Sequence, residues 1–236
     1  MREMPVDGCG SMFVVCSYER VKGLAVSETT YPLDQTGLIV IDATNDFISE
    51  GGKLWDAVKD VVTAVGVLPN LTRAIDAARS VQIPVLHAPM VTQPWDYGEW
   101  QNTSLTHKLL HQHQLFQAGT WGAEFHPDYV PADGDVVVVP HKAFDAFQGT
   151  DLDTQLRQRN IDHIILVGMV TNTCVDSTGR DAYEKGYHVT FVTDSVGAFS
   201  MEAHRATIEH DWPRFAHEIL TTDELVASLK NSTRRS

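Results

Sequence analysis

A cysteine stands where a strand-like segment gives way to a helix-like one. Residues 164–167 read Ile-Ile-Leu-Val, and residues 168–176 continue as Gly-Met-Val-Thr-Asn-Thr-Cys-Val-Asp before the helix-like stretch. The positive end of a helix stabilises a thiolate, which is the nucleophilic form of cysteine. The same turn aims backbone N–H groups outward, where they can hold an oxyanion. Cys174 is therefore a candidate nucleophile, with a buried cysteine that packs as a small hydrophobic residue as the alternative.

Two further polar residues follow predicted strands. Asp42 ends the apolar run Leu38–Ile41, and Lys142 follows the run over residues 135–139. In one cleft with a thiol, the carboxylate could transfer protons while the ammonium group orients the carboxylate and stabilises the thiolate. The thiolate would attack a carbonyl group and form a thioester, which water hydrolyses to an acid after an amine or ammonia has left. His141 stands beside Lys142, and either residue could be the charged partner.

Apolar runs and helix-periodic segments alternate along the chain. The predicted strands cover residues 38–41, 83–88, 135–139, 164–167, 188–192 and 219–220. The predicted helices cover residues 58–81, 105–115, 152–159, 201–208 and 223–229, and another helix follows Cys174 and ends near residue 186. This alternation predicts an α/β fold: a single domain with a mostly parallel central sheet and helices on both faces. Because ligands bind at the carboxyl ends of such strands, we expect Asp42, Lys142 and Cys174 to meet at one edge.

Composition narrows the choice of partners. The chain has 31 acidic residues against 18 lysines and arginines, a formal charge of -13, which argues against nucleic acid and anionic membranes. The apolar runs are far shorter than the roughly 20 residues of a membrane-spanning helix. The three cysteines form no disulfide framework and the N-terminus has no signal-peptide pattern, so we expect reduced thiols and a cytoplasmic location. The expected partner is a small-molecule substrate, with no nucleic acid and no membrane.

Irregular segments suggest how the chain is organised. We expect an N-terminal arm, a main domain and a C-terminal tail, over residues 1–35, 36–230 and 231–236. Residues 90–131 are rich in Trp, His, Gln and Gly, which predicts an excursion that covers the substrate. Within it, Trp95, Tyr97 and Trp100 could form a lid or a subunit contact. A homo-oligomer, either a dimer or a tetramer, is expected.

Three stretches resemble the signature motifs of the isochorismatase-like cysteine hydrolases. They are residues 39–47 (Ile-Val-Ile-Asp-Ala-Thr-Asn-Asp-Phe), the stretch around Lys142, and residues 168–175. The similarity runs from about Thr36 to Leu229. The family includes nicotinamidases, N-carbamoylsarcosine amidase, biuret and ureidoacrylate hydrolases, and isochorismatase itself. The resemblance implies a three-layer, Rossmann-type fold.

The resemblance also implies roles for single residues. Asp42 corresponds to the catalytic acid and base of the family, Lys142 to its electrostatic partner and Cys174 to the nucleophile. Family members are similar in having a cis peptide bond in the turn, which would join Met169 and Val170 here. The backbone N–H groups of Val170 and Cys174 would then form the oxyanion hole.

Three aromatic residues are candidates for contact with the substrate. Phe47 corresponds to a residue that lines the pocket in the family. Trp121 and Phe147 are further candidates, with packing in the core as the alternative because most aromatic side chains have that role.

Two departures from the family motifs narrow the expected activity. Nicotinamidases bind a metal through an Asp-x-His pattern and a second histidine, and residues 87–92 (His-Ala-Pro-Met-Val-Thr) lack that pattern. We therefore expect no metal and no cofactor. Isochorismatases that cleave a vinyl ether typically lack a cysteine in this turn, so Cys174 favours hydrolysis of an amide or ureide. The alternatives are a vinyl ether hydrolase that uses Asp42 alone, and a family member that binds without catalysis.

Overall fold

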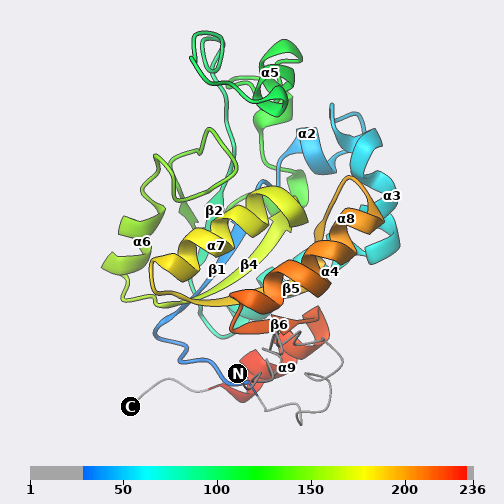
Figure 1. Cartoon of the computed structure of the whole chain (residues 1–236). Coiled ribbons are helices and arrows are strands. Elements are labelled where there is room, and N and C mark those ends of the chain that lie inside the picture. The colour runs from blue at the N-terminus through cyan, green and yellow to red at the C-terminus, as the bar shows by residue number, and fades with distance from the viewer. Residues whose placement is uncertain (1–28, 233–236) are drawn as a thin grey trace, which may run out of the picture.

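Six strands form one sheet in the described part of the chain, in the order β3-β2-β1-β4-β5-β6 (Figure 1). All neighbouring strands are parallel, which confirms the predicted α/β fold. The strands are β1 (Thr36–Ile41), β2 (Val85–Ala88), β3 (Val136–Val137), β4 (His163–Met169), β5 (His188–Gly197) and β6 (Glu218–Leu220). The computed structural model describes residues 29–232, so most of the predicted arm and residues 233–236 lie outside it.

The strands differ in burial as their sequences predict. β1 is buried along its whole length and β4 along nearly all of it, because helices cover both faces of the sheet centre. β3 lies at the edge, and it is shorter than the predicted strand over residues 135–139. Val137 and Val139 are each about half exposed there, while Val138 is buried and its N–H donates to the carbonyl of His87 at 2.9 Å. The extended backbone beyond β3 thus still follows β2 toward the carboxyl edge.

Helices form the outer layers. α3 (Trp55–Val65), α4 (Val67–Ser80) and α9 (Thr222–Asn231) cover one face, and α6 (Leu152–Gln158), α7 (Asp176–Glu184) and α8 (Met201–Ala206) cover the other (Figure 1). The predicted helix over residues 58–81 is two helices. The break is at Gly66, whose φ of 77° is one that glycine adopts readily. No helix within residues 29–232 combines the length and the apolar character that crossing a membrane requires.

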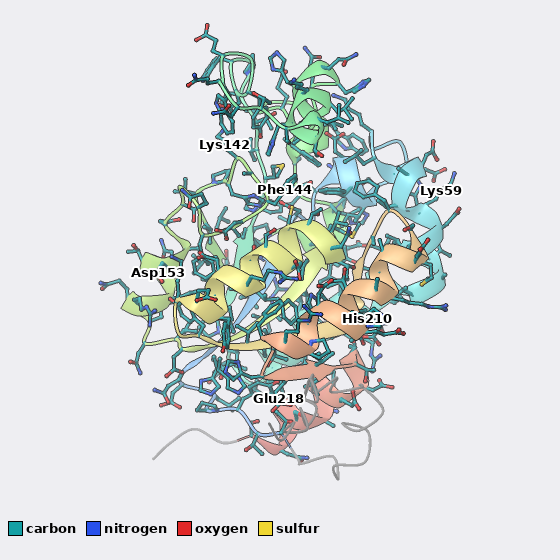
Figure 2. The ribbon with its side chains drawn as sticks, viewed as in Figure 1. Lys59, Lys142, Phe144, Asp153, His210 and Glu218 are labelled. Carbon is teal, nitrogen blue, oxygen red and sulfur yellow. The ribbon has the colours of Figure 1, made fainter. Side chains whose placement is uncertain are left out.

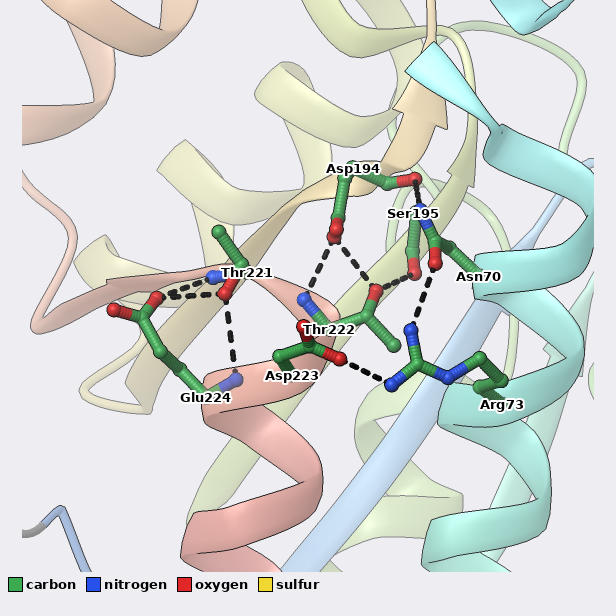
Figure 3. Close-up of polar contacts among 8 residues, drawn as sticks. All are labelled: Asn70, Arg73, Asp194, Ser195, Thr221, Thr222, Asp223 and Glu224. Atoms are coloured by element: carbon green, nitrogen blue, oxygen red, sulfur yellow. Dashed lines mark hydrogen bonds and ion pairs between the residues drawn. The ribbon is translucent and has the colours of Figure 1, made fainter.

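Polar side chains fix α9 against the sheet (Figure 3). The carboxylate of Asp194, on β5, accepts hydrogen bonds from the backbone N–H and the hydroxyl of Thr222 at 2.7 and 2.6 Å. The side chain of Asn70, on α4, donates to the Asp194 carbonyl at 3.1 Å. Thr221 and Glu224 form a reciprocal capping box at the first turn of α9. The last helix is therefore joined to both β5 and α4.

The excursion over residues 90–131 projects from the body beyond the strand ends and carries α5 (Leu105–Gln112) (Figure 1). Asp46, in the short helix α2 (Asn45–Ile48), holds its base. The Asp46 carboxylate accepts the backbone N–H groups of Phe116 at 2.7 Å and Lys53 at 3.2 Å. Gly122 packs directly on that carboxylate, because a Cβ there would lie 2.4 Å from the carboxyl carbon. Asp46 therefore fixes the excursion to the main domain.

The order of the sheet reverses between β1 and β4. The chain passes from β1 to β2 and β3 on one side, and from β4 to β5 and β6 on the other. Ile41 is paired with Gly168, so the two strands end side by side. Gly168 has a φ of 112°, and a Cβ there would lie 2.0 Å from the Ile41 carbonyl oxygen. In open α/β sheets this crevice is where ligands bind.

Candidate active site

Asp42 follows β1 at the crevice. Its backbone has a φ of 52°, in the left-handed region where aspartate is enriched. The residue is 1% exposed, and its Oδ1 accepts hydrogen bonds from the Met90 backbone N–H at 2.6 Å and from Nε2 of His141 at 3.0 Å. Its Oδ2 is buried and has no hydrogen-bond partner among residues 29–232. One oxygen is thus held in place while the other is available to accept a proton.

Cys174 lies across the crevice, in the π-helical turn Thr171–Val175 that leads into α7. It is 2% exposed. Burial, and then the neighbouring Asp42 carboxylate, raise the pKa of the Cys174 thiol well above its ordinary value. Burial and Asp42 thus oppose the stabilisation of a thiolate that the start of a helix provides. The thiol lies beside a carboxylate that disfavours its ionisation.

His141 takes the position predicted for a lysine. It is 1% exposed and pairs with Met90 in an isolated parallel bridge beyond the end of β2. Its Nδ1 lies 2.5 Å from the carbonyl oxygen of Ala143, and its Nε2 lies on Asp42. Burial alone would lower the pKa of His141, but the charge of Asp42 and the hydrogen bonds at both ring nitrogens outweigh burial and raise it.

Lys142 points away from Asp42. Its ammonium group donates to the Val91 carbonyl and forms an ion pair with Asp96, each at 2.8 Å, and its side chain is 37% exposed. Lys142 lies toward the base of the protruding excursion, with Phe144 below it (Figure 2). The structure therefore brings Asp42 and Cys174 together as expected but does not bring Lys142 to them. Neighbouring residues of an extended segment face opposite sides, so only His141 or Lys142 can face the crevice.

The turn before Cys174 has the backbone that the resemblance implies. The peptide bond between Met169 and Val170 is cis. The Val170 backbone forms a hydrogen bond with the Cys174 sulfur, which favours the thiolate and partly offsets the rise in the pKa of the thiol. Val170 therefore places an N–H group beside the sulfur, where a bound carbonyl oxygen would arrive.

The three predicted substrate-binding aromatics lie in different places. Phe47 is buried in α2, five residues after Asp42 in the sequence. Its ring contacts that of Phe116 with centroids 4.7 Å apart. The Trp121 carbonyl accepts from the Asn45 side chain at 2.8 Å, while its ring is 49% exposed. Phe147 packs on Tyr187 with centroids 5.7 Å apart, just before the start of β5. That contact lies at the end of the sheet opposite to Asp42 and Cys174, and Phe147 packs there in the core.

Tyr97 is a site residue that the sequence left undecided. It is buried, and its hydroxyl donates to the Lys142 carbonyl. Burial raises the pKa of Tyr97, and the carboxylates of Asp96 and Asp42 raise it further. Its ring packs on that of Trp100 with centroids 4.8 Å apart. Tyr97 thus joins the excursion to the segment that carries His141, as expected of a lid.

Comparison with known proteins identifies the family. Residues 36–224 match the model of the isochorismatase domain. The chain belongs to the isochorismatase family. Ureidoacrylate amidohydrolase RutB from Variovorax paradoxus (strain S110) is 29% identical over 212 residues, which cover 84% of this chain and 82% of that relative. The uncharacterized isochorismatase family protein YwoC from Bacillus subtilis (strain 168) is 44% identical over 108 residues, which span 46% of this chain and 56% of YwoC.

A solved structure supports the same assignment. The cysteine hydrolase from Pseudomonas syringae pv. phaseolicola 1448A superposes on this isochorismatase-family chain with a TM-score of 0.68 and 26% identity, covering 86% of this chain and 97% of its own. The resemblance stated from the three motifs is confirmed, and the chain is a hydrolase. The non-catalytic alternative is therefore set aside.

No group of three or more His, Cys, Asp or Glu side chains within the described residues is arranged to hold a metal ion. His87 is the histidine nearest the segment where nicotinamidases carry their metal motif. Its Nε2 lies 3.1 Å from Oδ2 of Asp135. That carboxylate also pairs with Arg79 at 2.5 Å. His87 therefore belongs to a structural ion-pair network at β2 and β3.

Proposed function

We propose that this hydrolase cleaves a C–N bond of a small amide or ureide through a thioester on Cys174. The observation that carries the proposal is the pairing of a buried thiol with a buried carboxylate whose Oδ2 is unpaired. These groups lie at the strand reversal, where ligands bind in open α/β sheets. Oδ1 of Asp42 is held by two donors, so the carboxylate keeps its orientation while Oδ2 exchanges protons.

The first half of the reaction forms the thioester. The Cys174 proton moves to Oδ2 of Asp42 as the sulfur bonds to the substrate carbonyl carbon, whose π electrons move to oxygen. The N–H groups of Val170 and Cys174 stabilise this oxyanion. When the oxyanion collapses, the C–N bond breaks and the nitrogen takes the proton from Asp42. Ammonia or an amine leaves, and the acyl group stays on sulfur.

The second half regenerates the enzyme. Water gives a proton to Asp42 as its oxygen bonds to the thioester carbon. The C–S bond then breaks, and the sulfur recovers the proton from Asp42. The net reaction is amide plus water giving a carboxylic or carbamic acid and an amine, so no oxidant or second substrate is needed. Because burial and Asp42 raise the pKa of the Cys174 thiol, we place the proton transfer together with the attack.

The excursion carries a polar pocket that Tyr97 lines and that neither Asp42 nor Cys174 lines. A pocket of about 300 Å³ is lined by Tyr97, Thr92 and His111, together with Pro94, Leu110 and the glutamines 93, 112, 114 and 117. Neutral amide groups suit a small polar substrate with several hydrogen-bonding groups, such as a ureide. The likeness to ureidoacrylate amidohydrolase RutB supports the same class. We propose that Phe47 and Trp121 contact the substrate from the side of the crevice where α2 lies.

A substrate panel tests the proposal. Small amides and ureides are incubated with the wild-type enzyme and with Cys174→Ala, with and without a chelator, and ammonia release is measured. We expect release by the wild-type enzyme that a chelator does not change, and no release by the folded alanine variant. Turnover that survives in Cys174→Ala and disappears in Asp42→Ala would instead select the vinyl ether class of reaction.

A further inference from the structure

We propose that His141, and not Lys142, is the cation of this site: an imidazolium ion that fixes Asp42 through its Nε2–H. The proposal rests on the hydrolase function above and names the group that positions its acid and base. His141 is a positioning residue, because it acts on the substrate through Asp42. Its side chain is 1% exposed and its partner's is 0% exposed, so the pair is isolated from water.

The partners of the two ring nitrogens indicate a doubly protonated ring. Nδ1 lies 2.5 Å from the Ala143 carbonyl oxygen, which can only accept, so Nδ1 carries a hydrogen. Nε2 lies 3.0 Å from Oδ1 of Asp42, and that oxygen already accepts the Met90 N–H at 2.6 Å. An ionised carboxylate also accepts only, so Nε2 carries a hydrogen as well. A ring with hydrogens on both nitrogens is a cation.

The charges around His141 favour this cation. Asp42 is in direct contact, and Asp145 adds a second negative charge from the segment that follows. The nearest basic side chain in the sequence, Lys142, is turned to Asp96 and the Val91 carbonyl. Burial and the charge of Asp42 raise the pKa of Cys174, which disfavours a thiolate next to this pair. Together these groups raise the pKa of His141 above its ordinary value despite burial.

The backbone makes His141 a rigid support. Its N–H donates to the Pro89 carbonyl at 3.1 Å, and the residue is bridged to Met90, which itself donates to Asp42. The imidazolium and the Met90 N–H therefore hold one carboxylate oxygen from the same extended segments. Charge-assisted hydrogen bonds of this kind are about twice as strong as neutral ones. The cation thus holds Oδ1 of Asp42, while Oδ2 stays unpaired and can accept the Cys174 proton.

Kinetics of three variants separate the two candidate cations. His141→Gln keeps an N–H donor but removes the charge, and we expect kcat to fall at least about tenfold with little change in KM. Lys142→Met, the matched control, should stay within about threefold of wild type. His141→Lys should restore part of the loss and move the alkaline limb of the kcat/KM profile to higher pH, because lysine loses its proton near pH 10.4 and histidine near 6.5. An inactive Lys142→Met enzyme beside an active His141→Gln enzyme would overturn the proposal.

A spectroscopic measurement decides the charge without any substrate. Histidine side-chain ¹⁵N spectra of the full chain at pH 7.5, assigned by the signals lost in His141→Gln, should show hydrogens on both ring nitrogens. Asp42→Asn should remove one of them at the same pH. A singly protonated ring in the wild-type protein would mean a neutral histidine beside a protonated Asp42, and the inference would be wrong even if Cys174 proved to be the nucleophile. If no amide is hydrolysed, the proposed function fails while this spectrum still decides the charge.

Discussion

Asp42 and Cys174 face each other because Ile41 and Gly168 are paired at the ends of β1 and β4. Asp42 directly follows Ile41 at the end of β1. Cys174 follows Gly168 through the turn that begins at Met169. The close pairing puts a negative charge beside a thiol that is already desolvated, and both effects raise the pKa of the thiol. The site is thus arranged for proton transfer from Cys174 to Asp42 within the enzyme–substrate complex.

Asp42→Asn should separate the two effects of this carboxylate. Without the negative charge the pKa of Cys174 falls, so iodoacetamide should label the Cys174 peptide at lower pH than in the wild-type enzyme. The proton acceptor is also lost, so kcat/KM should fall by about 10²–10⁴. Mass spectrometry of the labelled peptide across pH gives the first quantity and ammonia release the second. An unchanged labelling profile would mean that Asp42 does not set the state of the thiol.

Tyr97→Phe should loosen the lid. The variant loses the hydrogen bond to the Lys142 carbonyl but keeps the ring contact with Trp100. We expect KM to rise several-fold with a smaller change in kcat, and the free energy of unfolding to fall by about 0.5–1.5 kcal/mol. Tyr183→Phe, on the partly exposed surface of α7, is the matched control and should change neither. Equal kinetics for both variants would remove Tyr97 from the site.

Gly122→Ala should destabilise the base of the excursion. A Cβ at Gly122 would lie 2.4 Å from an Asp46 oxygen, and that carboxylate cannot move without losing the N–H groups of Phe116 and Lys53. We expect a loss of about 1–3 kcal/mol in urea unfolding. Gly98→Ala, whose Cβ would meet His111 at 3.4 Å, is the control and should be close to neutral. Comparable losses in both variants would show that the Asp46 contact is not the cause.

Three stacked histidines at the amino-terminal ends of β4, β5 and β6 should make the stability of the fold depend on pH. The His188 ring lies between those of His163 and His217, with centroids 4.5 and 4.3 Å away. Burial, and then the charges of those two neighbours, lower the pKa of His188 to about 4. An unfolded chain takes up this proton near pH 6.5, so the contribution of His188 to stability is complete above pH 6.5 and is lost as the pH falls toward 4.

His188→Phe keeps a ring in this stack but removes the titration. Urea unfolding of both proteins at pH 7.5 and 5.0 should show a smaller loss of stability in the variant at the lower pH. Identical losses would mean that other groups cause the acid sensitivity.

Much of the fold follows from sequence patterns. Apolar runs such as Leu38–Ile41 are buried on both faces, so periodicity and length suffice to place them as central strands. The edge strand β3 is shorter than its valine run, and the Val139 N–H beyond it donates to the Asp151 carboxylate at 2.7 Å. The break at Gly66 depends on a single left-handed residue, which the helical period of the flanking residues conceals.

The sequence predicts the site residues only where the strand topology alone determines that they meet. Asp42 and Cys174 follow from the rule that parallel strands end at one edge. The choice between His141 and Lys142 depends on which of two neighbouring residues faces inward, and that is fixed by the bridge between Met90 and His141. Phe147 shows the same limit, since a position near a motif does not tell which edge of the sheet the side chain contacts.

Ammonia release by Cys174→Ala is the most direct test of the whole account. With an amide or ureide that the wild-type enzyme hydrolyses, the account predicts that the folded alanine variant loses at least about 10³-fold in kcat/KM, because no thioester can form. Acid-quenched wild-type enzyme should carry the acyl mass on the Cys174 peptide. Turnover within tenfold of wild type by Cys174→Ala would contradict nucleophilic catalysis by this thiol.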